Sequence, residues 1–198
     1  MKNALRKFVP VESKFSSSSL NFYFAPAMTT TLRRATLDDA SILSHISYVT
    51  FEQTWDFFYT PEILKQYLEE NYSEEAIRRE LLDPDVMNFL AFVDGELAGF
   101  MKLSRKQTLA DWITDRCIEL CRIYVYKKFQ DQKVGKLLME KAIEVAKEEG
   151  MESIVLGVWE NNHKAVKFYT GFGFEQIGTH PFIVGTQVDT DWVMRKRV

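Results

Sequence analysis

The sequence has few of the residues that mark secreted, metal-binding or membrane-spanning proteins. Its 198 residues include only two cysteines and three histidines, and no run approaches 18 uninterrupted apolar residues, so no membrane-spanning helix is expected. The cysteines, Cys117 and Cys121, are four positions apart on a predicted strand, which is too far for a disulfide. Both are expected to be core thiols in a reducing cytosol, which favours a cytoplasmic protein.

An excess of positive charge is also missing. The formal net charge is −3, which argues against a nucleic-acid-binding surface. No group of His, Cys, Asp and Glu residues has the spacing of metal ligands, so no metal site is predicted. What is present is an apolar content of 46% in 198 residues, enough to bury one substantial core. Without internal repeats or an interdomain linker, a single enzyme-like domain is expected.

The first 28 residues differ from the rest in composition. They contain three early cations, four consecutive serines (Ser16 to Ser19) and the aromatic patch Phe22-Tyr23-Phe24, but no apolar core like that of a signal peptide. Residues 1–28 are therefore expected to be a poorly ordered extension, or to precede a true start at Met28. Residues 29–198 are expected to form the domain.

Apolar periodicity and turn signals predict the elements of the first half of this domain. In chain order they are an edge strand at Thr31–Arg34, a capped helix entry at Thr36–Asp39, helical stretches at Pro61–Tyr67 and Ser73–Leu82, and strands at Phe89–Val93 and Leu97–Leu103. The last two strands flank Asp94-Gly95, a strong signal for a two-residue hairpin.

The most informative segment is Cys121 to Lys136, where an apolar strand runs into a short polar loop that opens a helix. The loop from Gln130 to Gly135 would aim unpaired backbone N–H groups and the positive end of the helix at one point, which suits a pyrophosphate. Four lysines stand against one acid, Asp131, and they are Lys127, Lys128, Lys133 and Lys136. The alternative interpretation is an ordinary strand–loop–helix connection with a solvated lysine cluster.

The helix after this loop is amphipathic and should pack on a sheet, with Gly150 as its C-terminal stop. The apolar runs Ile123–Val125 and Ile154–Val158 predict a parallel pair of strands joined by a right-handed crossover. The loop then lies at the carboxyl end of the first strand, where ligands of open α/β sheets bind. Farther along, Asn162 is expected to cap a short helix that ends near Gly171.

Two motifs, in this order, resemble a known family. Gln130-x-x-Lys133-x-Gly135, followed by Asn162-x-x-Ala165-x-x-Phe168-Tyr169 and Gly173-Phe174, resembles the acetyl-coenzyme A signature of the GNAT N-acetyltransferases. The resemblance implies an α/β GNAT fold, with a mixed central sheet flanked by helices in one domain, and transfer of acetyl from the co-substrate acetyl-CoA to a small-molecule primary amine. The tail Gly178–Gly185 with Thr190-Asp191 is most similar to PaiA-type spermidine/spermine acetyltransferases, which implies a polyamine acceptor.

The resemblance also implies which residues bind acetyl-CoA. They are Ile123, Tyr124, Val125, Gln130, Asp131, Gln132, Lys133, Val134, Gly135, Lys136, Asn162, Ala165 and Phe168. In the family the two parallel strands splay apart, and the thioester carbonyl accepts a backbone N–H, here that of Tyr124 or Val125. Lys133 departs from the pattern because the family usually has glycine there. A positive φ at Lys133 would cost about 1 kcal/mol, which its ammonium could offset by reaching a phosphate oxygen.

Two residues are candidates for proton transfer. Tyr169 stands at the family's tyrosine position, which implies that it protonates the departing thiolate; the alternative is a purely packing aromatic ring. The resemblance also implies that Glu119 is the candidate base, acting directly or through water, because several family members carry a carboxylate on this strand eleven residues before the position of Gln130. The alternative for Glu119 is a solvated or salt-bridged acid beside Arg122.

The acceptor is less well defined by the sequence. Carboxylates and aromatic faces suit ammonium groups, and the candidates are Glu52, Trp55, Asp56, Tyr59, Asp189 and Asp191, any of which could equally be solvated. His180 is a weaker candidate base, while His45 and His163 are interpreted as surface or helix residues. The alternatives to a polyamine enzyme are a ribosomal-protein-type amino-terminal acetyltransferase and a non-catalytic acyl-CoA-binding regulatory module, and a homodimer is left open.

Overall fold

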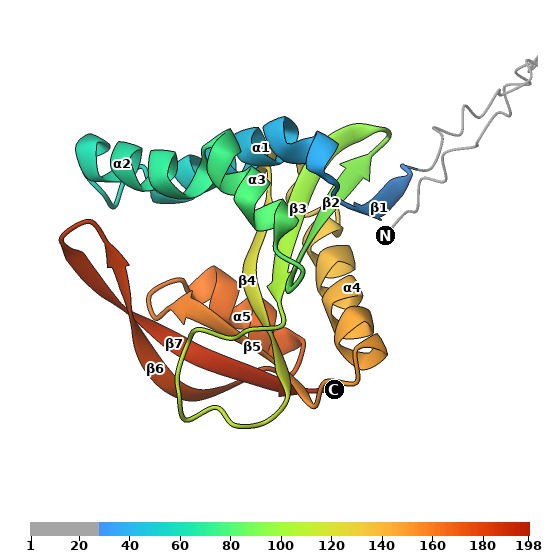
Figure 1. Ribbon diagram of the computed structural model, residues 1–198, viewed down its shortest axis with the longest axis vertical. Coiled ribbons are helices and arrows are strands. Elements are labelled where there is room, and N and C mark those ends of the chain that lie inside the picture. Colours follow the sequence, from blue (N-terminus) through green and yellow to red (C-terminus); the bar gives the residue numbers. More distant parts are fainter. Residues whose placement is uncertain (1–27) are drawn as a thin grey trace, which may run out of the picture.

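One mixed sheet runs through the molecule (Figure 1). The computed structural model describes residues 28–198, so the extension predicted over residues 1–28 lies outside the described residues except for Met28. The strand order is β1-β2-β3-β4-β5-β7-β6. The strands are β1 (Thr30–Arg34), β2 (Val86–Val93), β3 (Glu96–Ser104), β4 (Cys117–Val125), β5 (Ser153–Trp159), β6 (Glu175–Val184) and β7 (Gln187–Arg197). Only β4 and β5 pair in parallel among these neighbours, so the predicted mixed sheet is confirmed.

Helices cover both faces of the sheet. They are α1 (Ala40–Trp55), α2 (Pro61–Tyr72), α3 (Glu74–Leu82), α4 (Val134–Glu148) and α5 (His163–Gly171), with short 3-10 turns η1 (Leu37–Asp39) and η2 (Lys127–Phe129). The first three share one apolar core with β2 and β3, which includes Leu43, Leu68 and Phe100. The helices α4 and α5 share the core on the opposite face, which includes Leu138 and Tyr169. In the part of the chain that the structure describes, no helix is long and apolar enough to cross a membrane.

The ends of the elements follow the local sequence signals. Thr36 and Asp39 form a capping box ahead of α1, in which the Thr36 N–H donates to the Asp39 carboxylate at 2.8 Å. Asn162 caps α5 by accepting the Ala165 N–H at 3.1 Å. The β2–β3 hairpin turns at Asp94 and Gly95, whose φ angles of 49° and 82° are the positive values that such a tight turn requires. These three predictions are confirmed.

The second helix is longer than predicted. It was expected to end at Tyr67 but continues to Tyr72. The reason is that Leu64, Leu68 and Tyr72 recur every four residues and are all buried, so the last turn adds to the same apolar stripe.

The parallel pairing of β4 with β5 is confirmed, but the predicted extent of that pairing is wrong. The strands pair only between Cys117–Glu119 and Ser153–Val155, so Ile123–Val125 has no partner in β5. A bulge explains the divergence, because Leu120 pairs with Leu103 and Arg122 with Lys102, which leaves Cys121 unpaired against β3. Bulges bend a strand and increase its twist. The strand β4 therefore leaves β5 in the middle of the sheet and opens a gap between them.

Candidate active site

The gap between β4 and β5 continues into a groove of about 450 Å³ that reaches the start of α4 and the side of α5. All residues predicted to bind the cofactor line this groove except Gln132, whose side-chain amide donates to the Lys128 carbonyl at 2.9 Å. The groove also contains Thr54, Phe129 and Lys164, which the sequence pattern did not identify.

The loop before α4 presents unpaired backbone donors to the groove. Asp131 and Lys133 both adopt left-handed conformations, with φ angles of 63° and 65°. Within the described chain, the N–H groups of residues 131–136 donate no hydrogen bond to protein atoms. Successive N–H groups that converge at a helix N-terminus form an anion site. A Cβ built on Gly135 would contact nothing closer than Phe168 at 3.8 Å, so there is room for a phosphate above the first turn.

Cations surround this loop, although not the set that was predicted. Lys133 and Lys136 line the groove, whereas Lys127 and Lys128 do not. Lys128 instead pairs with Glu96. Lys164, which was not predicted, also lines the groove, and its Nζ donates to the Gln130 Oε1 at 2.8 Å. The sequence could have identified Lys164, because it lies two residues after the Asn162 cap and within the second motif, whose helix was expected to face the cofactor.

The free edge of β4 supplies a further donor at the gap. The Tyr126 N–H donates to the Ala98 carbonyl of β3 at 2.9 Å. Since N–H groups alternate in direction along a strand, the Tyr124 N–H also faces β3 and the Val125 N–H faces the open gap. Of the two donors predicted for a thioester carbonyl, this geometry favours Val125.

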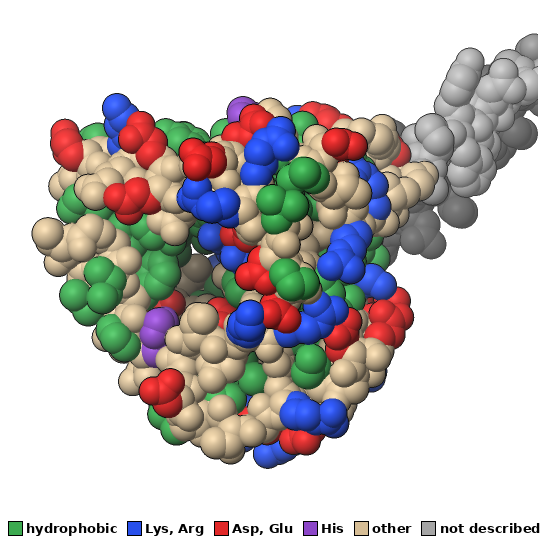
Figure 2. Space-filling view, viewed as in Figure 1, with side chains coloured by type: hydrophobic (Ala, Val, Ile, Leu, Met, Phe, Trp, Pro, Cys, Tyr) green, Lys and Arg blue, Asp and Glu red, His purple; other side chains and the backbone are tan. Residues whose placement is uncertain are grey.

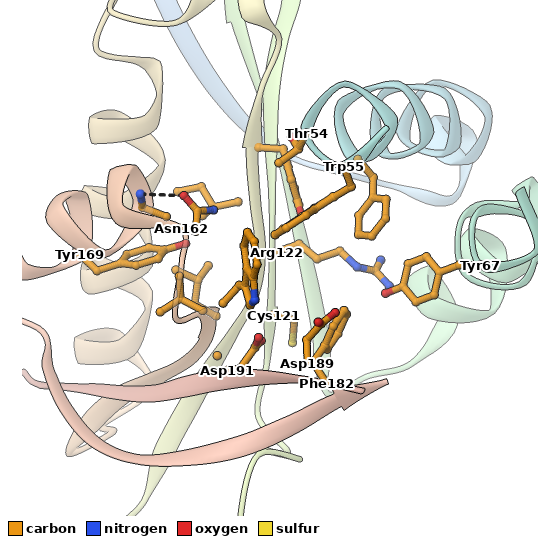
Figure 3. A pocket seen from close by; sticks show the side chains of 18 of the residues that line it. Thr54, Trp55, Tyr67, Cys121, Arg122, Asn162, Tyr169, Phe182, Asp189 and Asp191 are labelled. Carbon is orange, nitrogen blue, oxygen red and sulfur yellow. Dashed lines mark hydrogen bonds between the residues drawn. The ribbon is translucent and has the colours of Figure 1, made fainter. Parts of the chain in front are cut away.

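A second cavity, of about 180 Å³, opens beside the groove (Figure 3). Its walls come from α1, the segment after it, α2, β4, β5, α5, β6 and β7. Both spaces share the residues Thr54, Ile123, Tyr124, Asn162, Ala165 and Tyr169. Figure 2 shows the surface hollowed between α1–α3 and the β6–β7 hairpin. A molecule in the groove and another in the cavity would therefore meet at the gap between β4 and β5.

Tyr169 lies where the two spaces meet. Its ring extends from α5 with the hydroxyl directed into the cavity (Figure 3). Burial raises the pKa of the Tyr169 hydroxyl, so it keeps its proton at neutral pH. The ring also packs against Phe174, with centroids 5.9 Å apart. The predicted proton donor and the packing aromatic are thus compatible roles of one residue.

Glu119 lies outside both spaces. It is buried, with 7% of its surface exposed, and its carboxylate accepts the backbone N–H of Thr108 at 2.7 Å and the Thr108 hydroxyl at 3.2 Å. The suggested pairing with Arg122 is wrong, because Arg122 pairs with Glu80 at 2.9 Å. Both Thr108 donors bind the same oxygen, Oε2, and Glu119 lines neither space, so its role in catalysis stays a prediction.

Two other carboxylates do line the cavity, and both come from β7. Asp189 accepts the Tyr59 hydroxyl at 2.9 Å and the Gln187 amide at 3.1 Å. Asp191 is 8% exposed and accepts no hydrogen bond from any residue between 28 and 198. Burial, followed by the nearby charge of Asp189, raises the pKa of Asp191 to about 7.

Aromatic rings line the same cavity as these carboxylates. Trp55 and Tyr59 were predicted, and Trp159 and Phe182 join them. The ring centroids of Trp55 and Trp159 are 5.5 Å apart. The predicted Glu52 and Asp56 are exposed and do not line the cavity. Such a wall of rings with nearby carboxylates suits an organic cation.

Arg122 places one cation on the opposite wall. It extends from β4 toward Tyr67 (Figure 3) and lies over the Tyr72 ring at 4.6 Å. Its partner Glu80 also binds Lys102, at 2.6 Å. Arg122 is therefore fixed in position by packing and by an ion pair.

The histidines lie outside both spaces. His45 and His163 are exposed, as interpreted from the sequence. His180 pairs with Asp191 in the β6–β7 register but does not line the cavity. Burial lowers its pKa. Among residues 28–198, no three His, Cys, Asp or Glu side chains gather as metal ligands would.

Comparison with known proteins gives a consistent result. A model of the acetyltransferase (GNAT) family matches residues 48–174. An uncharacterized N-acetyltransferase in the pepI 3' region of Lactobacillus delbrueckii subsp. lactis is 33% identical over 151 residues, covering 76% of this chain and 87% of that protein. The spermidine N(1)-acetyltransferase of Thermoplasma acidophilum is 25% identical over 174 residues, covering 86% and 98%. The solved structure of the PaiA N-acetyltransferase from Thermoplasma acidophilum, in complex with coenzyme A, matches with a TM-score of 0.70 and 24% identity, covering 86% of this chain and 99% of that chain.

Proposed function

The chain belongs to the GNAT acetyltransferase family and is an N-acetyltransferase whose co-substrate is acetyl-CoA, and we propose that its acceptor is a polyamine such as spermidine or spermine. The observation that carries this proposal is the pair of carboxylates, Asp189 and Asp191, which line a cavity together with several aromatic rings, next to the groove. Carboxylates bind ammonium groups through charge, and aromatic faces add cation–π attraction. The similarity to a spermidine N(1)-acetyltransferase supports the same class of acceptor.

We infer one orientation for acetyl-CoA in the groove. Its pyrophosphate would bind the free N–H groups of residues 131–136, with Lys133 and Lys164 adding positive charge. The pantetheine arm would then follow the free edge of β4 toward the cavity. The Val125 N–H would bind the thioester carbonyl and stabilise negative charge on its oxygen.

Proton transfers complete the reaction. The acceptor reaches the cavity as an ammonium ion and must lose a proton before its nitrogen can attack the thioester carbon. The departing thiolate needs a proton, for which the buried hydroxyl of Tyr169 is placed between groove and cavity. Glu119 does not line the cavity, so we expect it to influence the first transfer only through water or another residue.

A panel of amines tests the acceptor. The release of free thiol from acetyl-CoA is measured with spermidine, spermine, simple monoamines and peptides with free amino-termini. We expect spermidine and spermine to have the highest kcat/KM. Asp189→Asn should raise KM for spermidine more than for a monoamine. Spermidine has a further ammonium group that would lose Asp189 as its partner, and a monoamine has none. Preference for peptide amino-termini would refute the polyamine proposal and leave the acetyltransferase function intact.

One observation favours a second candidate acceptor. Arg122 lines the same cavity as Asp189 and Asp191, on the opposite wall. An amine that also carries a carboxylate or phosphonate could bind Asp189 and Asp191 through its ammonium group and Arg122 through its anion, since a guanidinium binds such anions well. The panel should therefore include amino acids and aminoalkylphosphonates, and a preference for these would identify Arg122 as the determinant of specificity.

A further inference from the structure

We propose that Asp191, rather than Glu119, accepts the proton of the acceptor amine, and that Gly157 provides the space that lets its carboxylate reach the cavity. This inference rests on the proposed acetylation of an amine, but not on which amine is acetylated. It assigns a direct catalytic contact to a β7 residue for which the sequence suggested only substrate binding.

The position of Asp191 follows from the pairing of β7 with β5. Asp191 lies opposite Trp159, at the end of β5 where β4 has already diverged. A Cβ built on Gly157 would lie 3.3 Å from the Asp191 Oδ2 and 3.2 Å from the Leu109 Cδ2. The carboxylate therefore crosses over the β5 backbone at the one residue that has no side chain. Glycine within a strand often marks such a close approach.

Asp191 also has free hydrogen-bonding capacity on both carboxylate oxygens, unlike Asp189. Tyr59 and Gln187 donate to Asp189, whereas the two Thr108 donors bind one oxygen of Glu119, Oε2, and Glu119 does not line the cavity. No group between residues 28 and 198 donates to the Asp191 carboxylate, which lines the cavity. An incoming ammonium group would be its hydrogen-bond partner. With a pKa of about 7, the side chain is basic enough to accept a proton at neutral pH and acidic enough to release it again.

Several other titratable groups lie in or near the cavity that Asp191 lines. The strands contribute Asp189 from β7, His180 from β6, and Glu119, Cys121, Arg122 and Tyr124 from β4. The helical side contributes Tyr59, which precedes α2, Tyr67 from α2 and Tyr169 from α5. Burial raises the pKa of each of the cavity tyrosines, so they stay neutral near pH 7. Arg122 stays cationic, paired with Glu80. Asp191, with a pKa of about 7, therefore titrates near neutrality, while burial lowers the pKa of His180 from its ordinary value.

The proton balance of the reaction is simple. Asp191 takes one proton from the ammonium ion, and the freed nitrogen lone pair forms the C–N bond with the thioester carbonyl carbon. The C–S bond breaks and its electron pair leaves on sulfur. Tyr169 gives its proton to that thiolate and regains one from the acetylated nitrogen. Asp191 then releases its proton to solvent, so the products are the amide, free coenzyme A thiol and one proton.

The test is the pH profile of kcat/KM for whichever amine of the panel is acetylated best. In the wild type, kcat/KM should fall as the pH drops below about 7. Asp191→Asn should lower it by roughly 100- to 10,000-fold at pH 7, with recovery of about tenfold per pH unit as free amine becomes available in alkaline solution. Glu119→Gln should keep the shape of the wild-type profile, and Asp111→Asn, an exposed loop variant, should keep both shape and rate.

The outcomes separate this inference from the proposed function. A wild type that acetylates no amine overturns the proposed function itself. Normal wild-type turnover with an Asp191→Asn profile parallel to that of the wild type overturns only the assignment of Asp191, and indicates substrate positioning. If kcat/KM recovered at alkaline pH in Glu119→Gln but not in Asp191→Asn, Glu119 would be the base and the assignment of Asp191 would be wrong.

Gly157→Ala provides an independent variant that keeps every ionisable group. The added methyl must displace the Asp191 carboxylate or the Leu109 side chain by a few tenths of an ångström. A small misplacement of a reacting group is costly, so we expect kcat to fall roughly tenfold or more while KM for acetyl-CoA stays constant. Gly171→Ala, with no atom within 4 Å of the new Cβ, is the matched control. Unchanged kcat in a folded Gly157→Ala enzyme would contradict the role given to Gly157.

Discussion

Lys133 keeps a backbone conformation that is unfavourable for its side chain. Its φ of 65° and ψ of 7° place it in the left-handed region, immediately before α4. For a residue with a Cβ this costs about 1–2 kcal/mol. The conformation nevertheless turns the loop so that the following N–H groups face the groove, and Lys133 itself lines that groove. A lysine at this position thus combines backbone strain with a charge next to the expected pyrophosphate.

A pair of variants separates strain from charge at Lys133. Lys133→Gly and Lys133→Ala both remove the ammonium, but only glycine relieves the left-handed strain. We expect Lys133→Gly to be about 1 kcal/mol more stable than Lys133→Ala in urea unfolding, after allowing for the greater freedom of glycine in the unfolded chain. Both should bind acetyl-CoA several-fold more weakly than the wild type by calorimetry. Equal stability of the two variants would show that the loop relaxes, and wild-type affinity in both would show that the ammonium does not reach a phosphate.

Removal of the Tyr169 hydroxyl tests its role in protonating the leaving group. Tyr169→Phe keeps the ring and its contact with Phe174, so the fold and the Kd for acetyl-CoA should not change. Loss of the proton donor should lower kcat by roughly 10- to 1,000-fold. Phe168→Leu is the comparison, because Phe168 lines the groove but not the cavity, and it should affect acetyl-CoA binding more than kcat. Wild-type turnover of Tyr169→Phe would leave Tyr169 with a packing role alone.

At the residue scale, the sequence predicted what is local. Asn162, Lys133 and Tyr169 belong to short motifs whose spacing within one loop or helix fixes their positions. The unpartnered carboxylate of Asp191 depends instead on the pairing of β5 with β7 and on the missing side chain of Gly157. A strand-interior glycine in Ile154–Trp159 was the available signal for this close approach.

At the scale of elements, the divergence of β4 from β5 creates the site. The groove, the free Val125 N–H and the entrance to the cavity all lie beyond Glu119, the last β4 residue that pairs with β5. Apolar patterns predicted both strands and the helix between them, because each element buries a regular stripe or run. The point of divergence could not be read from those patterns, since it depends on the bulge at Cys121 against β3.

The backbone N–H groups at the start of α4 should bind the cofactor. A bulky side chain in place of Gly135 would block access to them. Acetyl-CoA at about 100 times its Kd should stabilise the wild type by about 2.7 kcal/mol, or roughly 5–10 °C in Tm for a domain of this size. Gly135→Leu should fold, because a Cβ there would have only ordinary contacts, with Phe168 at 3.8 Å and Val125 at 3.9 Å, but should lose that shift. Gly171→Leu is the control at another helix, and should keep it. An undiminished shift in Gly135→Leu would place acetyl-CoA elsewhere.

At the scale of the whole molecule, the active site and the stability of the fold are linked through Asp191. Its carboxylate, buried beside Asp189 and without a hydrogen-bond donor among residues 28–198, is costly to ionise, which is why its pKa is raised to about 7. The ordinary value in an unfolded chain is about 3.9. Protonated Asp191 therefore stabilises the folded state, and this contribution is complete below about pH 4 and is lost as the pH rises to about 7.

This linkage predicts that Asp191→Asn is more stable than the wild type at neutral pH although it is less active. The amide carries no charge, so the difference in Tm between variant and wild type should be small at pH 4, grow as the pH rises, and level off above pH 7. Scanning calorimetry between pH 4 and pH 8.5 measures that difference. Asp111→Asn, which changes an exposed aspartate in the loop before β4, should give a difference that does not vary over this range. If Asp191→Asn instead gave a constant difference, the carboxylate would be ionised throughout and could not serve as a base that titrates near neutrality.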